Sequence, residues 1–161
     1  MHKRASELIE ILRLKPHPEG GYFSEVFRAP ESVDPADGRP LRSSLTAIFF
    51  LLPAGELSRW HRVKSAEVWH CFEGDPLELV ILDPSLETPR RRILGPAGKD
   101  RLPLAVVPAG WWQAARTEGE YTLVGCTVAP GFEFEDFTLM SDEPEAFRLL
   151  RERHPGLTTF L

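Results

Sequence analysis

The chain has 161 residues, of which 42% are hydrophobic and 27% are charged. This length is typical of one domain, and such a domain can build its core without disulfides or a structural metal. The composition also excludes an intrinsically disordered chain. Nineteen basic against twenty-four acidic residues leave a net charge of −5, which does not attract phosphate backbones or anionic lipids. Nucleic acid and membrane are therefore excluded as main partners.

The cysteines and the apolar segments indicate where the protein works. Cys71 and Cys126 both lie within apolar stretches, which is typical of small buried side chains rather than of a disulfide framework. Glu7 and Glu10 interrupt the apolar residues near the N-terminus, so this segment does not resemble a signal peptide. The longest uncharged apolar run, 45–52, is far shorter than the ~20 residues of a membrane-spanning helix. We therefore expect a cytoplasmic protein in a reducing compartment.

The first expected element is a short helix that Ser6 caps and that Pro16 and Pro18 end. Helical periodicity then disappears, and short β-rich runs separated by Gly, Pro and Asp take its place. These runs cover residues 22–28, 45–52, 57–62, 67–73, 77–82, 91–95, 102–107, 111–116, 121–128 and 134–139. A second helix is expected to begin at 141–144 and to end at 155–156. The pattern predicts an all-β sandwich or barrel with a short helix at each end.

The segment 55–74 contains the most informative spacing. Alternate side chains of a strand share a face, so His61 and Val63 point to one side of their strand. By the same rule, Glu67 and Trp69 share a side of the next strand. His61 and Glu67 are therefore predicted to meet inside one cavity.

These residues also carry a family resemblance. Segment 55–74 resembles the first cupin motif, a Gly, five residues, His-x-His, three or four residues, Glu, six residues and Gly, except that Val63 replaces the second His. Residues 108–113 are similar to the second motif, Pro-x-Gly-x-x-His, with Gln113 in the place of the His. Further similarity lies in the stretches 16–23, 45–52 and 124–132. From about residue 6 to 155, the chain resembles the cupin subfamily called cupin 5 or DUF985.

This resemblance implies a double-stranded β-helix, that is, a jelly-roll barrel with a ligand cavity inside. We expect a single cupin domain over residues 1–161, with the motif-bearing core at about 16–140. The resemblance also implies a homodimer, with apolar strand surface and the Gly20-Gly21 strand as contributors to the interface. It does not imply an agreed reaction.

The departures from the cupin motifs bear on metal binding. Cupins hold a metal with three His and one Glu, whereas this chain offers His61, Glu67 and the amide oxygen of Gln113. A neutral amide oxygen is a poor ligand for a transition metal, and Val63 contributes no ligand at all. We therefore expect no cofactor. Weak binding of a divalent transition metal at these three residues is the alternative.

The leading hypothesis assigns a role to each polar residue of the cavity. His61 is the general base, and Glu67 holds its tautomer and stabilises the imidazolium. Gln113 either polarises a substrate carbonyl or closes the hydrogen-bond network around Glu67. Tyr22 donates a proton if the reaction is similar to that of cupin sugar epimerases. Glu19 either caps the mouth of the pocket or stabilises the adjacent turn.

Other residues of these segments have simpler interpretations. Phe50 and Trp69 are expected in the ligand-binding wall, although a jelly-roll core would use them in the same way. His70 lies one residue off the Glu67 face, so strand alternation turns it away from the cavity. Cys71 is on the favourable face but has no evident base to activate it, so we expect an inert thiol.

Three functions are consistent with these residues. In the first, the barrel binds a small polar metabolite, such as a sugar derivative, and isomerises or epimerises it by proton transfer without a cofactor. In the second, the same residues only bind a small molecule. In the third, the chain is a metal-dependent cupin enzyme whose incomplete ligand shell is completed by water.

Overall fold

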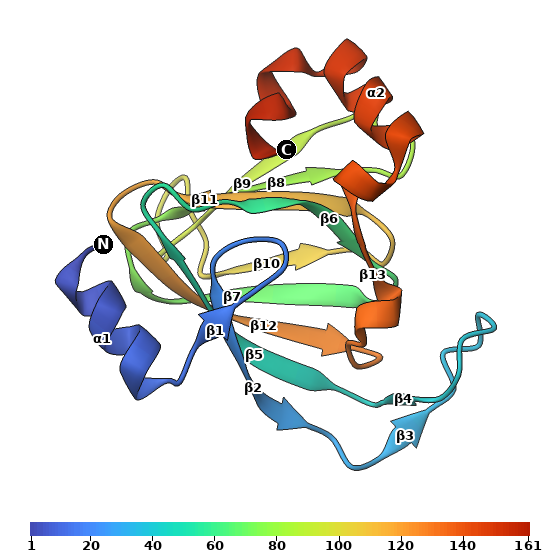
Figure 1. Cartoon of the computed structure of the whole chain (residues 1–161), viewed down its shortest axis with the longest axis horizontal. Coiled ribbons are helices and arrows are strands. Elements are labelled where there is room, and N and C mark those ends of the chain that lie inside the picture. Colours follow the sequence, from blue (N-terminus) through green and yellow to red (C-terminus); the bar gives the residue numbers. More distant parts are fainter.

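The computed structural model describes all 161 residues and consists mainly of two antiparallel sheets (Figure 1). The six-stranded sheet has the order β1-β2-β5-β12-β7-β10, and the five-stranded sheet has the order β13-β6-β11-β8-β9. The bounds of the first sheet are β1 Lys15–Pro16, β2 Tyr22–Arg28, β5 Thr46–Pro53, β12 Tyr121–Ala129, β7 Ala66–Gly74 and β10 Leu104–Val107. Those of the second are β13 Phe137–Leu139, β6 Ser58–Val63, β11 Trp112–Thr117, β8 Leu77–Leu82 and β9 Arg90–Leu94. The predicted all-β jelly-roll barrel is confirmed.

Helices cover both ends of the chain. They are α1 Lys3–Ile11 and α2 Pro144–Arg153, with the 3-10 turns η1 Phe134–Asp136, η2 Met140–Asp142 and η3 Pro155–Phe160. Ser6 lies inside α1 and does not cap it, because the helix begins earlier and the His2 side chain accepts the Arg4 N–H. The helix also ends before Pro16, because the chain reverses at Arg13, where φ is +53°. No helix in the structure combines the length and the apolar character needed to cross a membrane.

The predicted β-rich runs coincide with strands to within two residues at each end, with one exception. Residues 134–139 were expected to form one strand, but the first half is the turn η1 and only Phe137–Leu139 is strand β13. The buried Asp136 carboxylate explains this turn, because it binds the guanidinium groups of Arg42 at 2.9 Å and Arg39 at 2.8 Å. These ion pairs connect η1 to the hairpin of β3 (Ser32–Val33) and β4 (Arg42–Ser43).

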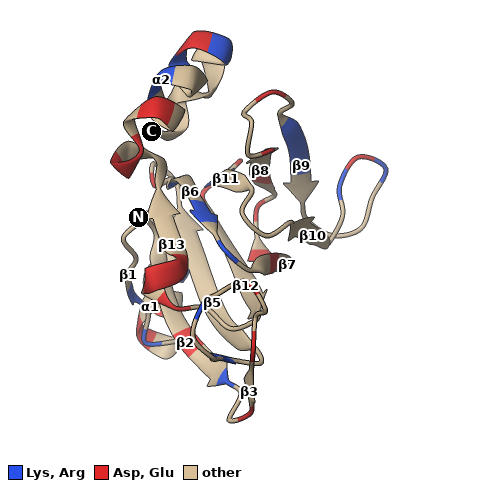
Figure 2. Ribbon diagram, turned by 90° about the vertical axis from the view of Figure 1, so that its right-hand side faces the viewer, with Lys and Arg blue, Asp and Glu red and all other residues tan.

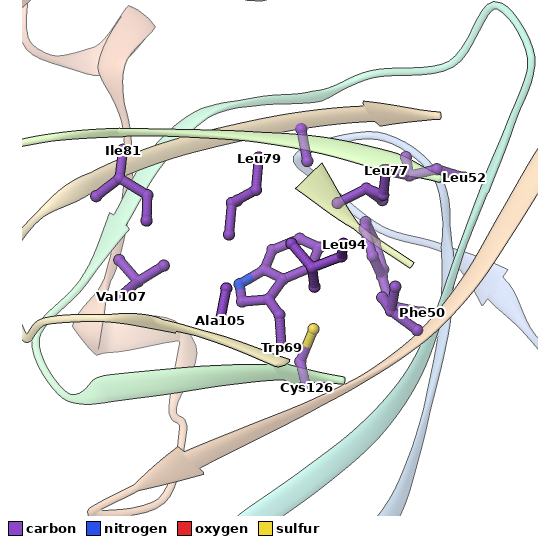
Figure 3. Packing of buried hydrophobic residues seen from close by; sticks show 12 residues of the cluster. Phe50, Leu52, Trp69, Leu77, Leu79, Ile81, Leu94, Ala105, Val107 and Cys126 are labelled. Atoms are coloured by element: carbon purple, nitrogen blue, oxygen red, sulfur yellow. The ribbon is translucent and has the colours of Figure 1, made fainter. Parts of the chain in front are cut away.

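Most of the barrel interior is a close-packed apolar core. Trp69 lies at its centre, with Ala105 and Cys126 on neighbouring strands close to its ring (Figure 3). The other buried members of this cluster are Phe50, Leu52, Leu77, Leu79, Ile81, Leu94, Val107, Ala115 and Val124. A second cluster packs α2 and η3 against the outer face of the five-stranded sheet, and a third packs α1 against β5 and β12. Close packing thus closes one part of the barrel and leaves a cavity where polar side chains meet aromatic ones.

Candidate functional site

A cavity of about 80 Å³ lies inside the barrel, beside the turn η1. Its walls are mainly aromatic and come from β2, β5, β7, β13 and the segment around η1: Phe23, Phe50, Trp69, Phe132, Phe134 and Phe137. Two histidines and two glutamates reach it from the interior: His17, Glu19, His61 and Glu67. Glu25 and Arg28 are exposed residues that line it on the solvent side.

Strand alternation places His61 and Glu67 in this cavity, as the sequence predicts. On β6, Trp60 packs into the outer cluster beneath α2, whereas the next residue, His61, points inward. On β7, Glu67 and Trp69 both face the interior, opposite Val128 and Cys126 of β12. The facing of the strands therefore follows from their sequence pattern.

The direct partner of His61 is Glu19, which corrects the prediction of a His61–Glu67 pair. The His61 Nε2 atom lies 3.2 Å from Glu19 Oε2, whereas no ion pair joins His61 to Glu67. Glu19 Oε2 also lies 3.3 Å from Nδ1 of His17, and its other oxygen accepts a hydrogen bond of 2.7 Å from the Ser58 hydroxyl. Glu19 is 6% exposed and lies within the site, so it does not cap the mouth.

A tight turn delivers His17 and Glu19 to the cavity. Within it, the His17 N–H donates to the Gly21 carbonyl and the Gly20 N–H donates to the His17 carbonyl. Gly20 has a φ of +111°, and a Cβ at this position would lie 2.0 Å from the carbonyl oxygen of Leu57. Only glycine fits there. The turn is therefore built so that the residues before Gly20 pack against β6.

Backbone hydrogen bonds fix the tautomers of both imidazoles. His61 Nδ1 lies 2.8 Å from the carbonyl oxygen of Arg59, so this nitrogen must carry the proton and a neutral His61 has a bare Nε2. His17 Nδ1 accepts the backbone N–H of Glu19 and is also bare. Glu19 Oε2 thus faces two acceptor nitrogens. These contacts are attractive only if a proton lies between the carboxyl and an imidazole nitrogen, either on Glu19 or on one of the two imidazoles.

Burial explains these protonation states. It raises the pKa of Glu19 to about 8, against the opposing effects of the Ser58 hydroxyl and the Arg59 charge. Burial also lowers the pKa of His17 to about 3, with the neighbouring His61 adding to the effect, and it lowers the pKa of His61. At neutral pH the group therefore consists of a carboxylic acid between two neutral imidazoles.

A second set of hydrogen bonds orients Glu67. The Trp69 Nε1–H donates to the Gln113 amide oxygen at 2.9 Å, so the amide nitrogen faces Glu67 and donates to its Oε2 at 2.5 Å. Burial raises the pKa of Glu67, whereas the nearby His61 acts to lower it. Gln113 does not line the cavity, and its carbonyl is already bound to Trp69. Of the two predicted roles of Gln113, contact with a substrate carbonyl is therefore wrong, and the structure agrees with the hydrogen-bond network that positions Glu67.

The remaining predicted residues divide between the cavity and the outside. Phe50 and Trp69 line the cavity and also belong to the core. Tyr22 packs against the α1 cluster on the opposite face of β2, so the prediction of a proton donor in the cavity is wrong for this residue. His70 stacks on Phe72 outside the barrel, as predicted. Burial raises the pKa of the Cys71 thiol, which lies outside the lining.

Sequence reasoning did not assign a role to His17 or to the aromatic residues around η1. His17 and Glu19 stand two residues apart before Gly20-Gly21, and this spacing was the available signal for a shared face. Phe134 and Phe137 line the cavity from segment 134–139, which was expected to be one regular strand. Its turn depends on Asp136 and two distant arginines, which no local pattern reveals.

The residues present do not fit the metal centre that cupins form with three His and one Glu. The Val63 side chain lines the cavity where the motif has its second His, and the Gln113 oxygen is bound to Trp69. No cluster of three or more His, Cys, Asp or Glu residues is arranged to hold a metal ion.

Comparisons with known proteins agree with this fold. The family model described as cupin superfamily (DUF985) matches residues 6–140, so the chain belongs to this family. Among curated proteins, the chain is similar to the uncharacterized protein YML079W of Saccharomyces cerevisiae, with 26% identity covering 96% of this chain and 84% of that protein.

Two solved structures of similar length share the whole fold. A hypothetical protein from Leishmania major has a TM-score of 0.83 and 32% identity, covering 97% of this chain and 96% of that chain. Protein SO0799 from Shewanella oneidensis has a TM-score of 0.82 and 30% identity, covering 96% of this chain and 92% of that chain. Oxalate decarboxylase from Bacillus subtilis shares the fold at a TM-score of 0.60 and 17% identity, covering 87% of this chain and 34% of that chain.

Proposed function

We propose that the chain binds a small molecule in this cavity and transfers a proton on it, as a cofactor-independent isomerase does. The observation that carries the proposal is the Glu19 carboxyl held between His17 and His61 inside an aromatic wall. A proton donor whose pKa lies near the working pH is suited to general acid catalysis. The cavity also excludes bulk water, which strengthens the electrostatic interactions between this group and the ligand.

Each polar residue then has a defined role. Glu19 donates its proton to the ligand. His61 accepts a hydrogen bond from the protonated Glu19 and helps it to take up a proton again after the reaction, and the Arg59 carbonyl fixes the orientation of His61. Glu67 accepts a proton from a second position of the ligand, so that the ligand is isomerised and the total number of protons is unchanged. Gln113 holds Glu67 in place for this step.

The size and walls of the cavity limit the ligand. Its volume of about 80 Å³ is below the ~150 Å³ of a cavity that accommodates benzene, so only a small head group is enclosed. Hydroxyl groups around a whole sugar ring would lose hydrogen bonds against the phenylalanine walls. We therefore favour a ligand with one compact polar head over a fully enclosed sugar.

The test has two stages. Native mass spectrometry of the protein purified from its own cells, followed by metabolite extraction, should identify a bound small molecule. Incubation of that molecule with the protein in deuterium oxide should then incorporate deuterium. We expect Glu19→Gln to lose the exchange, whereas His70→Ala retains it because His70 lies outside the barrel.

The same experiment examines the alternative of a binding protein without catalysis. In that case the molecule binds to the wild-type protein and no deuterium enters it. If no molecule is found and none from a metabolite extract binds, the proposed function is wrong.

We also propose that the chain forms a homodimer through the outer face of the six-stranded sheet near β10. Phe72, Leu104 and Val106 are exposed there by 56%, 43% and 53%, and β10 is the edge strand. Edges of this kind are commonly covered by a partner. Gly20-Gly21 instead packs within its own chain, against Leu57 and Leu51. Light scattering should report a dimer that Val106→Asp dissociates, and a wild-type species of 18.2 kDa would contradict the proposal.

We propose that the protein works in a reducing compartment, because its thiols are unpaired. Cys71 and Cys126 form no disulfide, which is typical of a reducing compartment such as the cytoplasm.

A further inference from the structure

The two buried carboxyl groups of the cavity have no positively charged partner of their own. Glu19 and Glu67 are only 6% and 7% exposed, and neither forms an ion pair with a lysine or arginine. Their hydrogen-bond donors are neutral side chains, as described above. The charge of Arg59 acts on Glu19, but its guanidinium binds the backbone carbonyls of Pro18 and Glu19 instead of the carboxyl group. Buried glutamates are uncommon unless they are paired, and because Glu19 is held as a neutral acid, Glu67 is the carboxyl group that lacks a positive charge beside it.

The solvent side of the cavity does not supply this charge. Arg28 is the only lysine or arginine in the lining, and it is bound to Glu25 at 2.9 Å and to Glu133 at 2.6 Å. Acidic residues also colour the turn η1 beside the cavity, whereas basic residues gather on β9 and on the loop towards β10 (Figure 2). The lining thus holds four glutamates and one arginine. Because Glu19 is protonated and Glu25 and Glu133 share Arg28, the Glu67 carboxylate is the unpaired charge, which would repel an anionic ligand and attract a cationic one.

Aromatic rings surround these carboxyl groups. Phe23, Phe50 and Trp69 line the inner walls, and Phe134, which is 53% exposed, lies at the solvent side. The faces of aromatic rings attract cations, and methylated ammonium groups are bound in this way because they are weakly hydrated. Rings combined with carboxyl groups favour such a cation over both an anion and a neutral group of the same shape.

We propose that the ligand of this cavity carries a small methylated ammonium head group, which lies among the aromatic rings next to Glu67 and Glu19. This inference rests on the binding part of the proposed function and names the class of its ligand. The enclosed volume of about 80 Å³ takes up only part of such a head group, and the remainder of the molecule extends past Phe134 towards solvent.

A pair of probes of equal shape tests the charge directly. Choline and its neutral carbon analogue, 3,3-dimethylbutan-1-ol, differ at the head group only in that a carbon replaces the charged nitrogen. Isothermal titration calorimetry of the full-length wild-type protein should show choline binding at least about tenfold more tightly than the alcohol. Equal affinities, tighter binding of the alcohol, or no binding of choline would each overturn the proposal.

Matched variants locate the effect. Glu67→Gln keeps the shape of the side chain and removes its charge, so the advantage of choline over the alcohol should fall about tenfold while the affinity for the alcohol stays the same. Glu118→Gln makes the same change on an exposed loop outside the cavity and should leave both affinities unchanged. An unchanged advantage in Glu67→Gln would contradict the assigned position. If that variant does not fold, Phe134→Ala at the exposed edge should weaken choline binding several-fold, and no weakening would contradict the aromatic contribution.

The outcome is separable from that of the proposed function. The ligand extracted from cells can show deuterium exchange and yet lack an ammonium group, in which case only the ligand class is wrong. If choline binds with the expected preference but the natural ligand shows no exchange, only the proton transfer is wrong.

Discussion

The two parts of the barrel interior use the same strands for different purposes. In the closed part, β7 and β8 place Trp69, Leu77 and Leu79 in a dry core, whereas a few residues away β6 and β7 present His61 and Glu67 to the cavity. Buried polar groups are unfavourable unless they are hydrogen-bonded, so the polar part depends on its neighbours for every orientation. Substitutions in the core should therefore reduce stability, and substitutions in the cavity should mainly reduce ligand handling.

Trp69 and Gln113 connect the two parts. The indole ring packs at the centre of the apolar cluster, and its N–H orients the amide that in turn orients Glu67. A rigid core thus fixes the position of a catalytic candidate through two hydrogen bonds. Substitutions in the core, at this boundary and in the cavity should therefore differ in their effects on stability and on ligand binding.

The largest loss of stability is expected from Leu79→Ala in the closed part. Leu79 is fully buried, so its truncation leaves a cavity and should lower the free energy of unfolding by roughly 2–5 kcal/mol. Urea denaturation followed by tryptophan fluorescence measures this change. The protein that remains folded should still bind its ligand. A decrease in unfolding free energy of less than ~1 kcal/mol would show that the core is not close-packed at Leu79.

Gln113→Leu should have an intermediate effect at the boundary. It leaves the Trp69 N–H and the Glu67 carboxyl without partners, which costs about 2 kcal/mol of unfolding free energy. Because Trp69→Phe removes the orphaned N–H, Gln113→Leu should be less destabilising in that background. Equal losses in the two backgrounds would argue against the Trp69–Gln113 hydrogen bond.

Glu19→Gln should change how stability depends on pH. The folded protein holds the Glu19 proton up to about pH 8, whereas an ordinary glutamate loses it near pH 4.5, so wild-type stability falls as pH rises between these values. The variant lacks this group. Its free energy of unfolding relative to wild type should therefore rise between pH 5 and 8.5 by about 4 kcal/mol, which corresponds to roughly 10 °C in melting temperature.

His17 gives a pH dependence of the opposite sign. Its pKa of about 3 means that stability falls as pH drops below about 6.5. Because His17 contacts Glu19, the difference between the two proteins isolates Glu19 only above that pH, where His17 is neutral in both the folded and the unfolded chain. A difference that does not vary with pH would mean that Glu19 titrates normally.

The smallest effect is expected from His70→Ala. This side chain lies outside the barrel and is partly exposed, so its loss should alter stability by at most ~0.5 kcal/mol and leave ligand binding unchanged. By contrast, His61→Ala should abolish binding or turnover while the protein still melts cooperatively. The reverse result in parallel binding titrations would mean that the strand faces opposite to its position in the structure.

The sequence predicted most of the fold and only part of the site. Alternation along β6 and β7 was sufficient to direct His61 and Glu67 inward, because a strand has only two faces. The partner of His61 could not be found in this way, since Glu19 comes from a turn about forty residues earlier, and Gly20 brings it close to β6. The orientation of Gln113 was also hidden, because it depends on which atom of the amide Trp69 contacts.

The protonation state of Glu19 is the central claim, and it can be measured directly. A carbon-13 NMR titration of the glutamate carboxyl groups, assigned by comparison with Glu19→Gln, reports the pKa of this residue in the folded protein. We predict that the Glu19 signal is that of a carboxylic acid at pH 7 and titrates near pH 8. A signal that titrates near pH 4.5 would show an ordinary carboxylate and would contradict the account of the site.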